Sequence, residues 1–590
     1  MTRCAWTHRW AVLWGLLAAA QGCAFESADA LEDSAELQQR NACEADSDCG
    51  EGASCFEGLC VADELEAPLE VIVEVVPERG PGGSDSLPVV MGRMEIHAST
   101  VMDFELPESV QLQGQIRADG EPIAAEVSFV PLRSMPGRAP ALVSATTADA
   151  LQEGSGDADY SVRLLTGRDY RMVVRPSSPQ YPPLSRELEA GAEPMIAIDY
   201  GEVATRRQSF RVEGAPQGRT LILRAFDPQT GEPVSSAAPL LDGQATIAFS
   251  PGVLDYELEL RAEEAYDTFA DAAVDCDRPA RTLPTLRIPS DSFEEPLAEH
   301  IQLTLPAMPT TIRYEGSVEF CPEALGGEAA PPTDLPMTLR SSEVLLDAAA
   351  GALTGSFSAN ATASLDDGGQ QLRFCVELIA GQYEVIVTPP QSSPCAIFAE
   401  QRLIKAPDGK ASRGALLQLP AAAQLVGSVH SPEMAMVAGA VIEANALGRS
   451  EGPTLEEGDA TLLRFNRSQQ TTTDEEGAFR VPVDLGSYDV TIKPPEGSGF
   501  AWRLQHDVHI GARATEFMTR IDLVSPLSLR GHVRYPEPLL QETLAGALLR
   551  AYVVIQHPDG RERAIPIGKT TADEEGAFLL LLPPAVRAGW

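Results

Sequence analysis

The strongest constraint on the fold is a five-residue pattern that returns about once every hundred positions. Each copy has apolar residues at its first and third places and a glycine at its fifth. The five glycines are Gly114, Gly214, Gly316, Gly427 and Gly531. Their successive numbers differ by 100, 102, 111 and 104. Solenoid repeats are only about 20–45 residues long, so the period predicts five related domains in tandem.

The fourth copy shows most clearly what one unit contains. Residues 423–429 and 440–444 are apolar runs of strand length. An acidic turn at 471–477 leads into a further strand, and 486–494 alternates strictly before it ends at a proline. This order predicts a small antiparallel β-sandwich of about 100 residues. The acidic turn returns nearly unchanged at 570–578, and the second copy is the most degenerate.

These motifs resemble the carboxypeptidase regulatory-like domain, a prealbumin-like β-sandwich of bacterial surface and periplasmic proteins. The matching elements are an x-G-x-V opening, a T-x-T-D-x-x-G-x-F turn and a G-x-Y-x-V-x-x-P finish. The resemblance covers roughly four-fifths of the chain and is better for the fourth and fifth copies than for the first and third. It implies a mostly β fold, a tandem array of antiparallel prealbumin-like sandwiches, and says little about function.

The expected organisation has four short N-terminal parts followed by the five sandwiches. These are a signal peptide (1–22), an acidic tether (23–42), a cysteine-rich module (43–61), a β linker (62–107), and sandwiches at 108–200, 201–305, 306–419, 420–522 and 523–590. The linker holds one strong strand at 69–75. Leucine-proline pairs at 106–107, 305–306 and 419–420 precede three of the copies. Proline stiffens such joints, so we expect an extended rod.

The fifth copy stops where its closing strand would begin, after residues 579–584. Two explanations stay open: the gene product is truncated, or a strand comes from elsewhere. A sandwich without that strand exposes an unpaired edge and part of its core. The fifth copy is therefore predicted to be the least stable unit.

The first 22 residues have the pattern of a targeting segment. Two arginines precede the apolar stretch 11–20, which is too short to be a good membrane span. The small residues before Cys23 resemble the bacterial lipobox, in which the cysteine thiol is lipidated and becomes the mature N-terminus. Ala20 stands where leucine is usual, and an ordinary cleavage signal is the competing interpretation. The lipobox implies an outer-membrane lipoprotein that is held by its lipid. The sequence does not decide between the periplasmic and the surface-exposed face of that membrane.

Eight further cysteines fall into two groups. Cys43, Cys49, Cys55 and Cys60 lie within eighteen positions, which in an exported chain predicts two disulfides in a module with almost no core. Zinc is disfavoured there because no C-x-x-C pair or neighbouring histidine is present. The second group is Cys276, Cys321, Cys375 and Cys395. It is expected to staple the third copy or to lock it to the second, with three pairings open.

The acidic residues of the cysteine-rich module are weak candidates for calcium ligands. Asp46, Asp48 and Glu51 lack the full ligand set of a calcium loop and are interpreted as solvated turn acids. The chain as a whole has 44 basic and 86 acidic side chains, a net charge of −42. Nucleic acid and anionic lipid headgroups repel such a surface, so neither is an expected partner.

No catalytic residue, metal site or cofactor is predicted. The sequence has no P-loop, dinucleotide-binding glycine motif or G-x-S-x-G elbow. His430 and Glu433 have the H-x-x-E spacing of a zinc carboxypeptidase but follow a strand end, which indicates a chance match. His506 and His509 would point to opposite faces of a strand.

The favoured function is a non-enzymatic structural or adhesive β-rod of the cell envelope. Its partners would be the membrane, through the lipid, and envelope proteins or polysaccharide. A carbohydrate-binding surface protein is the alternative, since the fold is similar to starch-binding sandwiches, with Trp502 as the possible glycan contact. Accessory domains of a hydrolase are a third, weaker interpretation. The recurrent Tyr170, Tyr256, Tyr383 and Tyr488 are expected to be structural.

Overall fold

The protein is almost entirely β-sheet in the part of the chain that the computed structural model describes. The described residues are 42–49, 53–56, 59–62, 68–78, 87–138, 142–147, 160–193, 195–215, 220–250, 252–262, 284–293, 296–305, 311–321, 332–344, 354–365, 371–391, 393–405, 411–448, 455–457, 460–463, 465–511, 516–535, 544–556 and 560–589. Helical structure among them is limited to the short 3-10 turns η1 (Asp46–Asp48) and η3 (Ser290–Ser292).

The first two sandwiches share one plan. In the first, the sheets have the orders β12-β8-β15 and β11-β10-β13-β14, and in the second β19-β16-β22 and β18-β17-β20-β21. The strands of the first are β8 (Ser109–Ala118), β9 (Glu121–Pro122), β10 (Ala125–Pro131), β11 (Val143–Thr146), β12 (Tyr160–Leu165), β13 (Asp169–Pro176), β14 (Leu184–Glu189) and β15 (Met195–Asp199). Those of the second are β16 (Arg206–Glu213), β17 (Leu221–Phe226), β18 (Ala238–Pro239), β19 (Gln244–Phe249), β20 (Glu257–Ala262), β21 (Thr285–Pro289) and β22 (His300–Thr304).

The third and fourth sandwiches repeat this plan. The third contains β23 (Thr311–Glu319), β24 (Asp334–Val344), β25 (Thr354–Leu365), β26 (Leu372–Ile379), β27 (Gly381–Val387), β28 (Phe398–Ile404) and β29 (Ala411–Gln418). The fourth contains β30 (Ala423–His430), β31 (Val441–Ala446), β32 (Leu455–Glu457), β33 (Ala460–Leu462), β34 (Gln469–Thr472), β35 (Ala478–Val483), β36 (Gly486–Lys493), β37 (Arg503–Ile510) and β38 (Glu516–Asp522).

In all four units one strand carries the five-residue pattern, and in the second unit this strand ends just before the glycine. The strand lies between one antiparallel and one parallel neighbour. The four strands are β8, β16, β23 and β30. The parallel neighbour is each time the last strand of the same unit, namely β15, β22, β29 or β38. The recurrent pattern therefore marks the strand that holds one sheet of each sandwich together.

The pattern needs glycine because two neighbours approach its backbone closely. Gly427 pairs with Phe479 across the antiparallel strands. A Cβ at Gly427 would lie 2.4 Å from the Thr519 carbonyl oxygen and 2.7 Å from Cζ of Phe479. The equivalent glycines of the first, third and fifth units also have an aromatic residue opposite them, in the pairs Gly114–Tyr160, Gly316–Phe374 and Gly531–Phe578. An aromatic ring thus covers the space that the glycine leaves.

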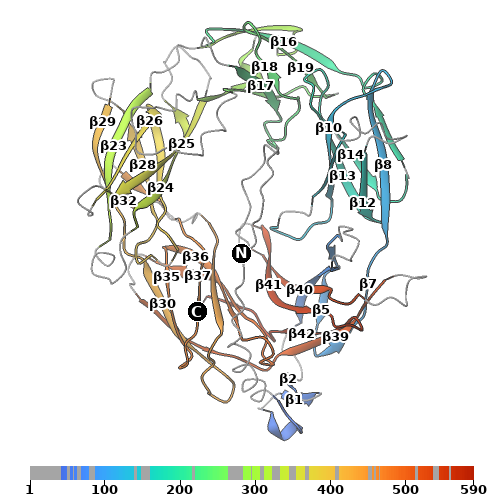
Figure 1. The fold of residues 1–590 in the computed structure, drawn as a ribbon, viewed down its shortest axis with the longest axis vertical. Helices are drawn as coiled ribbons and strands as arrows, with labels where there is room; N and C mark the ends of the chain where they lie inside the picture. Colours follow the sequence, from blue (N-terminus) through green and yellow to red (C-terminus); the bar gives the residue numbers. More distant parts are fainter. Residues whose placement is uncertain are drawn as a thin grey trace, which may run out of the picture.

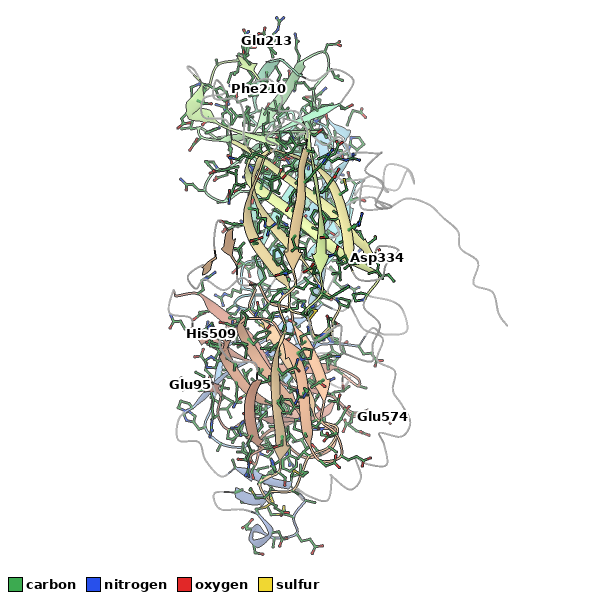
Figure 2. All side chains as sticks on the ribbon, turned by 90° about the vertical axis from the view of Figure 1, so that its left-hand side faces the viewer. Glu95, Phe210, Glu213, Asp334, His509 and Glu574 are labelled. Carbon is green, nitrogen blue, oxygen red and sulfur yellow. A yellow bond between two sulfur atoms is a disulfide. The ribbon has the colours of Figure 1, made fainter. Side chains whose placement is uncertain are left out.

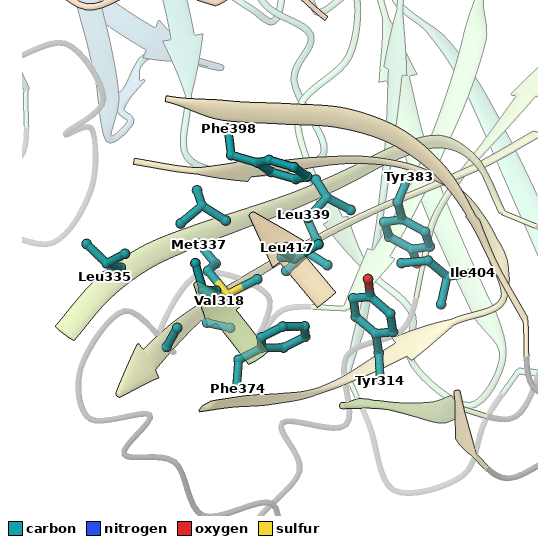
Figure 3. Packing of buried hydrophobic residues seen from close by; sticks show 14 of the residues in the cluster. Tyr314, Val318, Leu335, Met337, Leu339, Phe374, Tyr383, Phe398, Ile404 and Leu417 are labelled. Carbon is teal, nitrogen blue, oxygen red and sulfur yellow. The ribbon is translucent and has the colours of Figure 1, made fainter. Parts of the chain in front are cut away.

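Each sandwich has a core of its own, and the recurrent tyrosines belong to it. Figure 3 shows Tyr314, Phe374 and Tyr383 among the buried side chains of the third core. The Tyr383 hydroxyl donates a hydrogen bond to the Ile379 carbonyl oxygen at 2.7 Å, and Tyr488 does the same to Asp484 at 3.0 Å. These bonds span four residues, as in a tyrosine corner. The structural interpretation of these tyrosines is thereby confirmed.

The other two recurrent tyrosines are also buried and hydrogen-bonded. The Tyr170 hydroxyl accepts a hydrogen bond from the Leu165 amide at 3.1 Å. The Tyr256 hydroxyl donates to the Pro296 carbonyl oxygen at 2.7 Å, and burial raises the pKa of Tyr256 to about 12. A phenol in this setting stays protonated at neutral pH and serves packing.

Neighbouring units are joined by strand pairing as well as by the chain. β21 of the second unit pairs with β25 of the third, and β28 of the third pairs with β33. Through these contacts one sheet of the second unit, the strands of the third unit and the hairpin of β32 and β33 form one 13-stranded sheet. At the next joint, Arg467 pairs with Asp484 at 2.8 Å and donates to the Pro389 and Cys395 carbonyl oxygens. The joints are therefore built interfaces rather than free linkers.

The cysteine-rich module forms the predicted disulfides. Cys43 bonds to Cys55 and Cys49 to Cys60, beside the hairpin of β1 (Ala53–Phe56) and β2 (Leu59–Ala62). Three of these sulfurs lie within 4.8 Å of one another because the two bridges are adjacent. The Asp48 carboxylate accepts hydrogen bonds from the Glu44 and Ala45 amides, which lowers its pKa. Asp48 thus closes the turn, as expected of a turn acid; Glu51 lies outside the described residues.

The structure shows one disulfide of the second group of cysteines. Cys321 bonds to Cys395 and so joins the chain just after β23 to the chain just before β28 within the third sandwich. Cys375 is also disulfide-bonded, and Cys276 lies outside the described residues. One of the pairings left open by the sequence is thereby fixed.

The array is closed, and the expected extended rod is wrong. In Figure 1 the five units follow one another round a loop, so that the fifth unit meets the first. Figure 2 places Glu95 and Glu574, from opposite ends of the sequence, in the same half of the molecule, with Phe210 and Glu213 at the far end. Proline at each joint stiffens the local chain, but it does not fix the angle that accumulates over five joints.

We expect Gly427→Ala to lower the stability of the fourth sandwich by about 1–3 kcal/mol, because its Cβ overlaps a carbonyl oxygen and an aromatic ring. Gly511→Ala in the same unit is the control, since a Cβ there meets nothing within 4 Å. Urea unfolding of the two variants measures the difference. Equal midpoints for both variants would show that the glycine is not required by packing.

Candidate functional site

The candidate functional site is the seam at which the two ends of the described chain build one sandwich. The C-terminal part supplies β39 (Leu527–Arg534), β40 (Leu548–Gln556), β41 (Glu562–Thr571) and β42 (Ala577–Leu582), while β43 (Arg587–Ala588) pairs with β37 of the fourth unit. The N-terminal part supplies β3 (Leu69–Val76), β4 (Val89–Val90), β5 (Met94–Ile96), β6 (Thr100–Val101) and β7 (Phe104–Glu105). We call residues 69–78 and 87–106 the donor segment.

The donor segment takes the places that the last strands take in the other units. β3 pairs antiparallel with β40, from Val71 opposite Val553 to Val76 opposite Leu548. In the first four units the equivalent place belongs to β13, β20, β27 or β36, the strand that contains the recurrent tyrosine or directly follows it. β6 and β7 run parallel to β39, as β15 runs parallel to β8.

Two expectations are corrected by this pairing. Within the predicted linker, β3 to β7 are strands of a sandwich, and the fifth sandwich does not lack its closing strand. The strand comes from elsewhere, which was one of the two explanations left open. The prediction of an exposed edge and a weak fifth unit loses its basis, because β3 covers that edge. The segment was expected to be a linker because it directly precedes the first sandwich in the sequence. Strands can, however, pair with residues that are far away in the sequence.

β3 contributes its apolar side chains to the centre of the fifth core. Val71, Val73 and Val75 have no exposed surface, and they belong to one cluster with Leu529, Leu549 and Leu580. Burying three valines contributes roughly 4–9 kcal/mol. A whole small domain is stable by only about 5–15 kcal/mol, so the fifth sandwich depends on the donor segment.

The opposite face of β3 meets the first sandwich. Ile72 packs with Met135, Tyr552 and Ala564 in a separate buried cluster. The Ala564 amide donates a hydrogen bond to the Pro136 carbonyl oxygen at 2.8 Å. The guanidinium of Arg138 lies 4.8 Å above the Tyr552 ring. The donor segment is therefore enclosed between the first and fifth units.

Polar groups fix the register of the seam. The Glu74 carboxylate accepts a hydrogen bond from the Tyr552 hydroxyl at 2.8 Å and pairs with Arg550 at 3.3 Å. Burial and the neighbouring Glu74 charge both raise the pKa of Tyr552. On the other sheet, Asp103 accepts from the His532 amide at 2.8 Å and pairs with Arg534 at 3.0 Å. Ion pairs this exposed add little stability, but they penalise a shifted register.

The pentad glycine of the fifth unit is adapted to the donor segment. Gly531 has φ of 154°, and a Cβ there would lie 1.9 Å from the Met102 carbonyl oxygen. The Met102 amide donates to the Arg530 carbonyl oxygen at 2.6 Å, and the Leu106 amide to that of Arg534 at 3.0 Å. Glycine lets the parallel strand approach this closely.

A cleft of about 320 Å³ lies beside the seam, between the donor segment and the first sandwich. Its charged lining residues are Glu74, Arg133, Arg138, Arg168 and Asp169. Arg168 donates to the Val90 carbonyl oxygen at 3.2 Å, and Arg138 stacks on Tyr552. Two of the three cations thus hold the joint, and neither a cysteine nor a histidine lines the cleft.

The cysteine-rich module contacts the fifth unit at this same seam. The Ala62 amide donates to the Pro526 carbonyl oxygen at 2.9 Å. The Arg530 guanidinium lies 4.3 Å from the centre of the Phe56 ring, and burial lowers the pKa of Arg530. Figure 1 shows β1 and β2 just outside the loop, next to β39 and β42.

The other sequence-predicted site residues lie apart from the seam or beyond the described residues. Cys23 is among the latter. Trp502 lines a cleft of about 80 Å³, and the Lys493 amine lies 4.4 Å above its ring. No helix in the described part of the chain is long and apolar enough to span a membrane.

The histidines considered for metal binding have other contacts. The His430 ring is buried and hydrogen-bonds with the Ser428 hydroxyl at 2.8 Å, while Glu433 is exposed on the following turn. His506 contacts Asp507 at 2.8 Å, and His509 lies 3.5 Å from the Ser487 hydroxyl. These contacts fit the interpretation of the H-x-x-E spacing as a chance match.

No protein-family profile matches the sequence, and no curated protein matches it. Among solved structures, a streptococcal ancillary pilin matches at 12% identity over 54% of this chain and 99% of its own, with a TM-score of 0.18. A minor pilin of Streptococcus agalactiae matches at 14% identity over 36% and 95%, with a TM-score of 0.20. The major pilin of Bacillus cereus matches at 9% over 71% and 99%, with 0.12. With these TM-scores, the likenesses carry no functional argument.

We expect Val73→Asp to unfold the fifth sandwich, because an unpaired buried carboxylate costs on the order of several kcal/mol. Trypsin should then cleave residues 527–582 while residues 423–523 stay resistant. Val101→Asp is the control, since that donor residue is 70% exposed. Equal resistance of the fifth unit in both variants would contradict the dependence on β3.

Proposed function

We propose that this protein is a non-enzymatic structural or adhesive protein of the cell envelope, built as a closed loop of β-sandwiches. The observation that carries the proposal is the pairing of β3 with β40. It joins the first and fifth units beside the point where the cysteine-rich module is attached. A force applied at the far side of the loop is then divided between the two chains of sandwiches that lead back to the seam. In a rod, every joint carries the whole force.

The attachment to the membrane is proposed to be a lipid on Cys23 in the outer membrane. The support for it is the run of small residues before Cys23 after a short apolar stretch. The acidic tether would separate the loop from the bilayer, which suits a surface with a net charge of −42. The seam would face the membrane, and the second sandwich would project away from it.

The adhesive contact is proposed to lie on the second sandwich. Its large side chains Leu241 and Leu254 are 67% and 69% exposed. Figure 1 places this unit, with β16 to β19, at the end of the loop opposite β1 and β2. An envelope protein or a polysaccharide would meet this end first. Exposed leucines favour contact with apolar surface on a protein.

We expect Cys23→Ser to release the protein from the membrane fraction, because the lipidated thiol is the proposed anchor. Incorporation of labelled fatty acid should be lost as well. Ala20→Leu restores the usual lipobox residue and should keep both. Unchanged membrane association of Cys23→Ser in high salt would contradict the anchor, whatever the role of the loop.

The adhesive contact has a separate test. The double variant Leu241→Asp and Leu254→Asp should lose retention on isolated envelope material, while the unanchored Cys23→Ser chain should be retained. Leu403→Asp is the control, because Leu403 is 51% exposed on the third unit. Full retention of the double variant would exclude the second sandwich as the contact.

Carbohydrate binding stays as a second candidate because Trp502 lines a cleft together with Arg503 and Arg587. Sugar rings stack on exposed aromatic faces, but the Lys493 amine lies over this ring. A polysaccharide screen with the Cys23→Ser chain would decide. Binding that Trp502→Ala abolishes would favour the glycan function over the structural one.

A further inference from the structure

We propose that the donor segment of one chain also completes the fifth sandwich of a second copy of this chain, giving head-to-tail assemblies. This inference concerns assembly, and it does not depend on the proposed envelope role. It rests on the residues of the seam alone.

The donor segment is a separate piece in the architecture. Its connection along the chain to the first sandwich is the short stretch Leu106, Pro107 and Glu108, between the end of β7 and the start of β8. All its sheet partners outside itself belong to the fifth unit. Rotation about this short connection gives up the contacts of Ile72 with Met135 and of Val90 with Arg168, but it breaks no strand pairing of the first sandwich. Exchange of such an element between chains is a low-cost route to oligomers.

We call the edges of β39 and β40 that pair with the donor segment the acceptor surface. This surface is incomplete without the segment, and its shape and charges fit the segment specifically. Without β3, the edge of β40 is unpaired, and Leu529, Leu549 and Leu580 lose cover in the core. The gap at Gly531 fits the Met102 backbone, and Arg550 and Arg534 sit opposite acids of the donor segment. A second copy offers the same backbone, valines and acids, so it is the occupant that fits.

The closed and exchanged forms contain the same seam contacts. The balance between them depends mainly on the concentration of donor segment that each acceptor encounters, from its own chain or from another. Within one chain the donor is held near its acceptor, so closure is favoured in dilute solution. At high local concentration, or while the fifth unit of a nascent chain is still absent, a donor can meet another acceptor first. Donor and acceptor are different surfaces, so the exchanged contact is heterologous and leads to larger rings or to filaments.

The direct test uses two complementary full-length variants in the Cys23→Ser background. Val73→Asp disables the donor, and Ala551→Asp disables the acceptor at its register partner. Neither chain can close on itself or assemble with its own kind. In a 1:1 mixture one compatible donor and acceptor remain, so we expect a heterodimer that stops at two chains. Light scattering after size-exclusion chromatography measures the mass.

The proposal is overturned if the mixture stays monomeric while trypsin resistance shows that the first four sandwiches of both variants are folded. It is also overturned if Val73→Asp alone forms the same dimer, because the contact then does not use the donor segment. Should either variant fail to fold, the next experiment decides without disturbing the core.

The second experiment is a covalent trap in the otherwise native chain. Glu74→Cys with Arg550→Cys places two thiols on register partners of β3 and β40. We expect a cross-linked monomer from dilute protein, and a ladder of cross-linked oligomers after unfolding and refolding at high concentration. Glu70→Cys with Arg550→Cys is the control, because Glu70 pairs with Glu95 instead. Cross-linking within single chains at every concentration would refute the exchange.

Discussion

The pairing of β3 with β40 is the interaction on which the rest of the structure depends. It joins residues 71–76 to residues 548–553 and turns five sandwiches in a row into a closed loop. Each of the first four sandwiches is closed by its own last strand, whereas the fifth takes its closing strands from the start of the array. The edge that β40 would otherwise expose is thereby covered by β3.

The sequence predicts the unit but not the closure. The five glycines, the acidic turns and the tyrosine strands gave the sandwich fold, because each signal reflects a local need. A glycine must admit a parallel strand and an aromatic ring, and a tyrosine must reach a carbonyl four residues away. The disulfides of the cysteine-rich module were equally predictable, since four cysteines so close together leave few partners.

The split sandwich was not predicted because pairing between residues about 480 positions apart leaves no local pattern. Two signals nevertheless point to it. Residues 69–77 have an apolar residue at every second position from Leu69 and end at Pro77, as the closing strand of the fourth unit ends at Pro494. Leu106 and Pro107 match the pairs at 305–306 and 419–420, which follow the last strands of the second and third units. The segment thus has the sequence of the end of a sandwich.

Hydrogen exchange of the intact protein, followed by mass spectrometry, tests the closed loop most directly. Closure predicts that the amides of 69–76 exchange as slowly as those of 548–556, because both strands open only when the fifth sandwich opens. The strand 423–430 in the fourth unit serves as the internal reference. Exchange of residues 69–76 at the rate of an unprotected linker, with residues 548–556 still protected, would contradict the account.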